Sequence, residues 1–117
     1  MRARIAGVLI LAAALVGCAH AATAPPAPEV ALPWPAATAA QVAGLQTAVD
    51  GGAQPWLLDP TQVALAYAGA RGWPDPAAVD TTAANVTIRS TVGTHVLTLA
   101  QPGKTGIAGI WVVTADR

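Results

Sequence analysis

Side chains that could perform acid–base or nucleophilic chemistry are few and scattered in this sequence. Ser90 is the only serine, and His95 is the only histidine in the region predicted to fold. A Ser-His-Asp arrangement would need both in one site, but their spacing across a predicted hairpin disfavours a productive geometry. A lone histidine, with no HExxH motif and no cysteine cluster, also provides too few ligands for zinc. The sequence therefore predicts no catalytic set, no metal site and no cofactor.

The acidic side chains have a structural explanation. Asp50, Asp59, Asp75 and Asp80 all fall at predicted helix ends or turns, where aspartate accepts hydrogen bonds from exposed backbone N–H groups. A hydrolase acting on envelope polymers is the alternative hypothesis. It requires Asp50, Asp59 or His95 to converge in one pocket.

One short motif matches a phosphate-binding loop only in part. Gly103-Lys104-Thr105 matches the end of a P-loop, but Thr98 stands where that motif requires its first glycine. The P-loop also needs a helix after it, to direct N–H groups at phosphate, and a strand is predicted instead. Nucleotide binding is therefore not expected from this segment.

The remaining reactive group is the thiol of Cys18, the only cysteine in the chain. Arg2 and Arg4 precede an unbroken apolar run from Ile5 to Val16, which ends just before it. About a dozen apolar residues suffice for a signal peptide, whereas a transmembrane helix needs about 20. The leader therefore predicts export.

The end of the leader, Leu15-Val16-Gly17-Cys18, resembles the lipobox of bacterial lipoproteins. That pattern has an aliphatic residue three positions before the cysteine and a small residue just before it. The resemblance implies that residues 1–17 are a signal peptide, that the Cys18 thiol receives diacylglycerol, and that the new amino group is often acylated, as with palmitate. Two or more acyl chains hold a protein stably on a membrane. The alternative is an ordinary secretory signal, cleaved at the small residues of Ala19–Ala24.

A proline-rich segment follows the lipidation site. Residues 18–37 contain five prolines, which prevent regular helix and sheet and favour extended backbone. This segment is predicted to be a disordered tether between the membrane and a domain over residues 38–117. Trp34, between two prolines, is expected to pack on that domain, with lipid headgroups or a partner as alternatives.

Net charge excludes one class of partner. Removal of Arg2 and Arg4 with the leader leaves four basic and six acidic residues. Nucleic-acid binding depends on many lysine and arginine contacts to phosphate, so it is not expected.

Capping signals predict two helices. Thr38 and Gln41 have the spacing of a capping box, which opens a helix over residues 39–50. Asp59-Pro60 combines a capping carboxylate with a proline suited to the first helical position, and the helix that it opens ends at Arg71-Gly72.

The hydrophobic period changes to two from Asn85 onward, which predicts strands. Strands are expected from Asn85, over residues 94–100 and over residues 110–114, with a turn at Ser90–Gly93. The fold class is therefore α+β, with two N-terminal helices packed on a three-stranded antiparallel sheet.

Trp56, Trp73 and Trp111 are expected to contribute much of the core, or else to line an exposed aromatic groove for a ligand or partner. The segments Val49–Pro60 and Gly109–Val113 look like a pattern found in small secreted bacterial domains of uncharacterised function, a resemblance that assigns no functional residues.

The sequence thus favours a non-enzymatic accessory or interaction domain, lipid-anchored on the extracytoplasmic face of the cell membrane, with an envelope protein as its partner. The alternative is a module that binds a small molecule, glycan or lipid in an aromatic groove.

Overall fold

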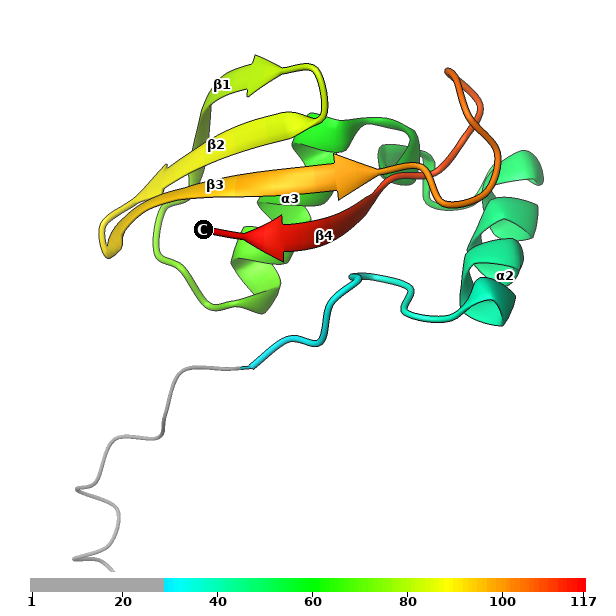
Figure 1. The fold of residues 1–117 in the computed structure, drawn as a ribbon, viewed down its shortest axis with the longest axis horizontal. Helices are drawn as coiled ribbons and strands as arrows, with labels where there is room; N and C mark the ends of the chain where they lie inside the picture. Colours follow the sequence, from blue (N-terminus) through cyan, green and yellow to red (C-terminus); the bar gives the residue numbers. More distant parts are fainter. Residues whose placement is uncertain (1–28) are drawn as a thin grey trace, which may run out of the picture.

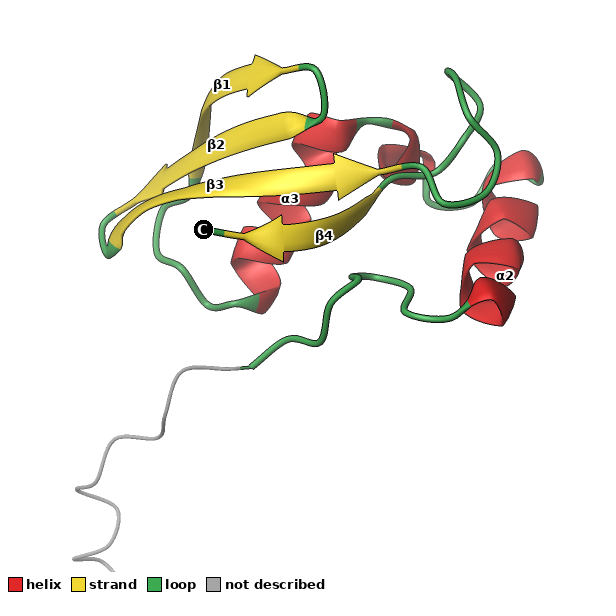
Figure 2. Ribbon diagram, viewed as in Figure 1, coloured by secondary structure: helices red, strands yellow, loops and turns green. Residues whose placement is uncertain are grey.

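The fold was obtained as a computed structural model, which describes residues 29–117. The predicted signal peptide, Cys18 and most of the predicted tether lie outside the described residues. The elements, in chain order, are α2 (Ala39–Asp50), the 3₁₀ turn η2 (Pro55–Leu58), α3 (Pro60–Ala70), β1 (Ala77–Thr82), β2 (Asn85–Ser90), β3 (Gly93–Ala100) and β4 (Val112–Asp116) (Figures 1 and 2).

Both helices begin where their caps predicted. The Thr38 hydroxyl accepts a hydrogen bond from the Gln41 backbone N–H, and the Gln41 side chain accepts one from the Thr38 backbone, which completes the capping box of α2. The Asp59 carboxylate accepts a hydrogen bond from the Thr61 backbone N–H, and Pro60 occupies the first turn of α3. Local hydrogen bonds therefore determine where these helices start.

The strands form one antiparallel sheet in the order β1-β2-β3-β4. The hairpin from Ser90 to Gly93 joins β2 to β3 as predicted, and the last strand runs two residues farther than expected, to Asp116. The prediction of three strands is wrong, because it missed β1. Its sequence, Ala-Ala-Val-Asp-Thr-Thr, has few strand-forming residues and is almost wholly exposed, so this edge strand depends on its pairing with β2.

Only one of the two helices covers the sheet as predicted. Helix α3 lies across one face of the sheet, where it contacts β1, β2 and β4. Helix α2 instead lies beyond one end of the sheet, next to η2 and the loop that precedes β4 (Figures 1 and 2). The prediction that both helices pack on the sheet is therefore wrong for α2.

The core lies between α3 and the sheet. Its centre consists of side chains with no more than 2% of their surface exposed, contributed by η2, by α3 and by the inner face of the sheet. They are Leu57, Val63, Ala64, Tyr67, Ala68, Val86, Ile88, Leu97, Leu99, Ile110 and Val113. The strand members alternate along the chain, as expected where one face of a sheet is buried.

The segment before α2 is packed against the domain. Trp34 and Val113 exchange two backbone hydrogen bonds, of 3.0 and 2.7 Å, so residues 29–38 run alongside the free edge of β4. Ala36 is buried, and Val30 and Trp34 pack on the core. We call residues 29–38 the strap. The sequence suggested that the domain starts at Thr38. The packed domain begins earlier, with the strap.

Candidate functional site

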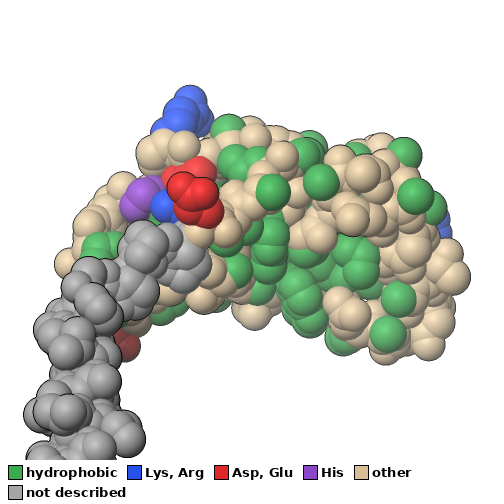
Figure 3. All heavy atoms as spheres, turned by 90° about the horizontal axis from the view of Figure 1, so that it is seen from below, with side chains coloured by type: hydrophobic (Ala, Val, Ile, Leu, Met, Phe, Trp, Pro, Cys, Tyr) green, Lys and Arg blue, Asp and Glu red, His purple; other side chains and the backbone are tan. Residues whose placement is uncertain are grey.

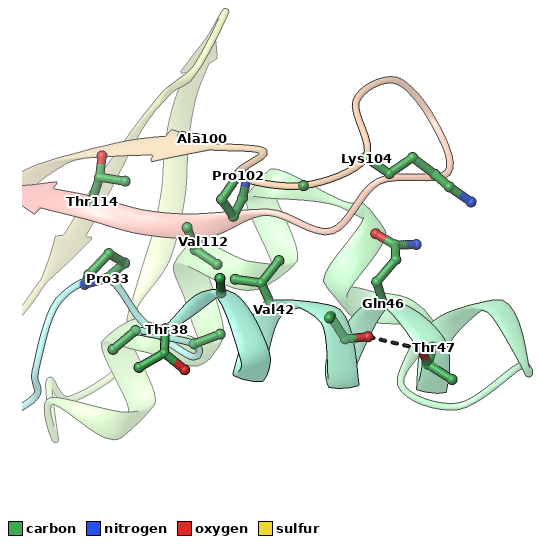
Figure 4. A pocket seen from close by; sticks show the side chains of 15 residues that line it. Pro33, Thr38, Val42, Gln46, Thr47, Ala100, Pro102, Lys104, Val112 and Thr114 are labelled. Atoms are coloured by element: carbon green, nitrogen blue, oxygen red, sulfur yellow. Dashed lines mark hydrogen bonds between the residues drawn. The ribbon is translucent and has the colours of Figure 1, made fainter.

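A groove of about 620 Å³ lies between α2, the strap and the ends of β3 and β4 (Figure 4). Its lining residues are Pro33, Ala36, Ala37, Thr38, Ala39, Val42, Ala43, Gln46, Thr47, Ala100, Pro102, Gly103, Lys104, Val112 and Thr114. We call this set the α2 groove. Its volume falls within the range of about 300–1,000 Å³ typical of small-molecule sites.

The groove exists because β4 presents two faces. Val113 points into the core, so its neighbours Val112 and Thr114 lie on the opposite side of the strand. On that side, small and aliphatic side chains of the strap and α2 leave a hollow that no large side chain fills. The face seen from below in Figure 3 is correspondingly rich in hydrophobic side chains along its middle, and its visible charges lie toward the two ends.

One glutamine joins the groove to the loop beside it. The Gln46 amide nitrogen donates hydrogen bonds to the Ala108 carbonyl, at 2.8 Å, and to the Asp50 carboxylate, at 2.9 Å. Its amide oxygen accepts one from the Ile110 backbone N–H, at 3.1 Å. Gln46 therefore attaches α2 to the chain that enters β4.

The loop over residues 101–109 is closed by a second glutamine. The Gln101 side chain donates to the carbonyls of Gly106 and Gly109 and accepts from the Gly106 backbone N–H. A Cβ atom at Gly109 would overlap the Lys104 carbonyl, so only glycine permits this close approach of the two backbone segments. The wall of the groove that carries Lys104 is therefore pre-formed.

Lys104 is the only ionisable side chain among the described residues that line the groove. Its Nζ lies 3.5 Å from Oδ1 of Asp50, and both side chains are half exposed. The hydrogen bond from Gln46, together with the nearby Lys104 ammonium, lowers the pKa of Asp50. Exposed ion pairs of this kind contribute little to stability, so the Lys104 ammonium is available to other partners.

A second cluster of polar side chains gathers around Asp116, on the core-facing side of the sheet near its other end. The Asp116 carboxylate lies 2.7 Å from His95 Nδ1, accepts a 3.0 Å hydrogen bond from the Tyr67 hydroxyl, and lies 3.7 Å from Arg71 Nη1. The indole of Trp73 stacks on the His95 ring, with centroids 3.9 Å apart, and has the Arg71 guanidinium 5.6 Å from its centre. Burial and the bond to Asp116 raise the pKa of Tyr67.

The Asp116 cluster resembles part of a hydrolytic site but lacks the rest. A histidine oriented by a carboxylate can act as a base, yet acyl transfer also needs a nucleophile within reach. The Ser90 hydroxyl is engaged in the β2–β3 turn, where it donates to the Gly93 carbonyl and accepts from the Val92 N–H. Asp50 interacts with Gln46 and Lys104 at the end of α2, and Asp59 caps α3, so neither joins His95.

The three tryptophans singled out from the sequence do not line the α2 groove. Trp73 is 8% exposed, and Trp56 and Trp111 are partly buried against the core. The aromatic rings instead form a chain through the packed interior: Trp56 to Trp34, Trp34 to Tyr67, Tyr67 to Trp73, and Trp73 to His95. Trp34 therefore packs as the sequence predicted, and its ring is the neighbour of the Trp56 ring.

Sequence reasoning missed Asp116 and Gln46. Asp116 lies two residues beyond the predicted end of the last strand. Had that strand been extended by two residues, Asp116 would have been placed on the same face as Leu97. Gln46 lies four residues before Asp50, a spacing that permits the side-chain hydrogen bond observed on α2. Its hydrogen bonds to Ala108 and Ile110 join residues 62 and 64 positions apart, so no local sequence pattern indicates them.

Within residues 29–117, no three His, Cys, Asp or Glu side chains gather in a way that could hold a metal ion. None of the helices in that range combines the length and apolar character needed to cross a bilayer. No family model matches the chain, and comparison with curated proteins and with solved structures likewise finds no match.

Proposed function

We propose that this protein is a lipid-anchored accessory domain of the bacterial cell envelope, attached through Cys18, which binds an apolar ligand in the α2 groove. The observation that carries the binding role is the groove itself, about 620 Å³ and lined mainly by aliphatic side chains. Transfer of this apolar surface out of water is favourable, and a bound apolar ligand covers it.

The position of the groove supports a role close to the membrane. Ten residues separate Cys18 from the strap, and even fully extended they span at most about 35 Å. The strap itself contributes Pro33 and Ala36 to the groove. A chain anchored at Cys18 therefore holds the groove within a short distance of the lipid surface.

The chemistry of the lining favours an apolar ligand over a glycan. Sugar hydroxyls lose hydrogen bonds to water on burial and need polar partners in return. The middle of the groove is formed by Val42 and Val112, and Ala36 and Ala43 also line it; none of these side chains has a polar atom. The tryptophans predicted to form an aromatic groove do not line it: Trp73 is buried, and Trp56 and Trp111 pack against the core.

Binding is favoured over catalysis because no acid–base pair lies in the groove. Lys104 is the one titratable group among its described lining residues. The His95–Asp116 pair belongs to the separate Asp116 cluster, and the hydroxyl of Ser90, the only serine, is engaged in the β2–β3 turn.

The anchor is tested by cell fractionation. The full chain and its Cys18→Ser variant are expressed in a bacterium with a lipoprotein pathway, and the membranes are washed with high salt. The native chain is expected to stay with the membrane, and the variant to leave it, because one oxygen replaces the sulfur that carries the lipid. Equal retention of both chains contradicts the anchor.

The groove is tested with Nile red, a neutral dye whose fluorescence rises in apolar surroundings. Ala43 lines the groove and Ala40 does not, although both are exposed alanines of α2. Ala43→Phe is expected to fill the groove and reduce dye affinity at least tenfold, whereas Ala40→Phe leaves it unchanged. Equal binding by both variants, or no binding by the native chain, contradicts the binding role.

A further inference from the structure

Building on this binding role, we propose that the ligand of the α2 groove is a single-chain anionic amphiphile. Its alkyl chain lies along α2, and its phosphate or carboxylate pairs with Lys104. Two observations carry this inference: the distribution of polarity along the groove, and the way in which Lys104 is held.

Polarity changes along the groove from one end to the other. Pro33 and Thr114 mark one end in Figure 4, Val42 and Val112 lie in the middle, and Lys104 and Gln46 mark the other end. An aliphatic channel that terminates in one cation matches a molecule with an apolar tail and an anionic head. A cationic head would meet the Lys104 ammonium of the lining, whereas the Asp50 carboxylate lies outside the lining and already accepts hydrogen bonds from Gln46 and Lys104.

The Lys104 ammonium can exchange Asp50 for a ligand, because Asp50 has a second hydrogen-bond partner. Its contact to Asp50 is 3.5 Å long and half exposed, so little is lost when it opens. Asp50 then keeps the 2.9 Å hydrogen bond from the Gln46 amide. The backbone of Lys104 meanwhile stays fixed, because the Gln101 side chain and the close approach of Gly109 hold the loop.

The volume of the groove is that of a site for one small ligand. One wall is the face of α2 that bears Ala39, Val42 and Ala43, and Val112 lies across from Val42. A volume of about 620 Å³ lies within the range that encloses one small ligand. A second copy of this chain would bury the same apolar face, so the test must distinguish dimer formation from ligand binding.

The test is displacement of Nile red from residues 18–117, the chain without its apolar leader, carrying Cys18→Ser so that it cannot be acylated. Three competitors share a twelve-carbon tail and differ in their head: dodecyl phosphate, dodecyltrimethylammonium and dodecyl maltoside, each used below its micellar concentration. Dodecyl phosphate is expected to displace the dye at a concentration at least tenfold below that of the other two. Shortening the tail should weaken binding about fourfold for each CH₂ removed.

Two matched variants locate the charge effect. Lys104→Gln is expected to reduce the preference for phosphate to about twofold or less, and Arg89→Gln, which removes an exposed cation outside the groove, should leave the preference intact. Raising the salt concentration should also lower the preference of the native chain, since mobile ions screen an exposed pair.

The outcomes separate the two proposals. Equal displacement by all three heads overturns the anionic amphiphile while the apolar binding role stands. Failure of Nile red and of every competitor to bind overturns both. A dimer in sedimentation that dissociates in the Ala43→Phe variant but not in the Ala40→Phe variant assigns the groove to a second copy, and that result too overturns the amphiphile.

Discussion

The Nδ1 atom of His95 lies 2.7 Å from Oδ1 of Asp116, so the third strand and the final strand are joined by a side-chain contact on the core-facing side of the sheet. The other oxygen of the same carboxylate accepts the hydrogen bond of the Tyr67 hydroxyl from α3. One carboxylate near the C-terminus therefore joins the helix and two strands.

Removal of that carboxylate should destabilise the fold. Asp116→Ala leaves the Tyr67 hydroxyl and the His95 ring without their acceptor in a partly buried place, which should lower the free energy of unfolding by about 2–3 kcal/mol. Urea denaturation followed by tryptophan fluorescence measures this. Asp80→Ala is the control, because that exposed carboxylate bonds only to Thr82 among the described residues, and it should cost no more than about 0.5 kcal/mol.

Stability should also fall at alkaline pH through Tyr67. The pKa of Tyr67 is raised in the folded state because burial and the bond to Asp116 both disfavour the phenolate. Its contribution is therefore fully present below the unfolded value of 10.0 and is lost as pH rises through the higher folded value. Thermal melting from pH 8 to pH 12 should show this decline, and Tyr67→Phe should remove it.

Ultraviolet absorbance gives an independent check on the same group. Tyr67 is the only tyrosine of the chain, so the phenolate band near 295 nm reports this residue alone. The midpoint of the folded protein should lie above that of the urea-unfolded chain. A midpoint at or below the unfolded one contradicts the assigned environment.

Replacement of glycine by alanine should have opposite effects on stability at Gly109 and Gly44. Gly109→Ala places a Cβ against the Lys104 carbonyl and should cost about 2–3 kcal/mol, with weaker Nile red binding because the groove wall moves. Gly44→Ala adds a methyl group in open space within α2 and should stabilise the protein by about 0.5–1 kcal/mol. Paired urea titrations compare the two, and equal effects would refute the tight approach at Gly109.

Loss of the Gln46 amide should affect both the fold and the groove. Gln46→Leu removes the acceptor of the Ile110 N–H and the donor to the Ala108 carbonyl, which should cost about 1–2 kcal/mol. Gln62→Leu, at an exposed position of α3, is the matched control and should have little effect. If both variants unfold at the same urea concentration, Gln46 does not join α2 to the loop as described.

Elements defined by neighbouring residues were predictable from the sequence. The capping box of Thr38 and Gln41 and the cap at Asp59 are hydrogen bonds between residues two or three positions apart, so both helix starts were correct. The β2–β3 hairpin is also local, and the period of two from Asn85 onward predicted its strands. The lipobox resemblance of Cys18 depends on adjacent residues as well, and it stays a prediction.

Features that join distant segments were decided only by the tertiary structure. Strand β1 has weak intrinsic preference and forms because β2 supplies its hydrogen-bond partners. The Asp116 cluster combines residues from α3, β3 and β4, and the α2 groove joins the strap and α2 to residues near the C-terminus. Capping and strand period report hydrogen bonds between near neighbours, whereas these sites depend on which faces pack together, and packing is settled by burial over the whole chain.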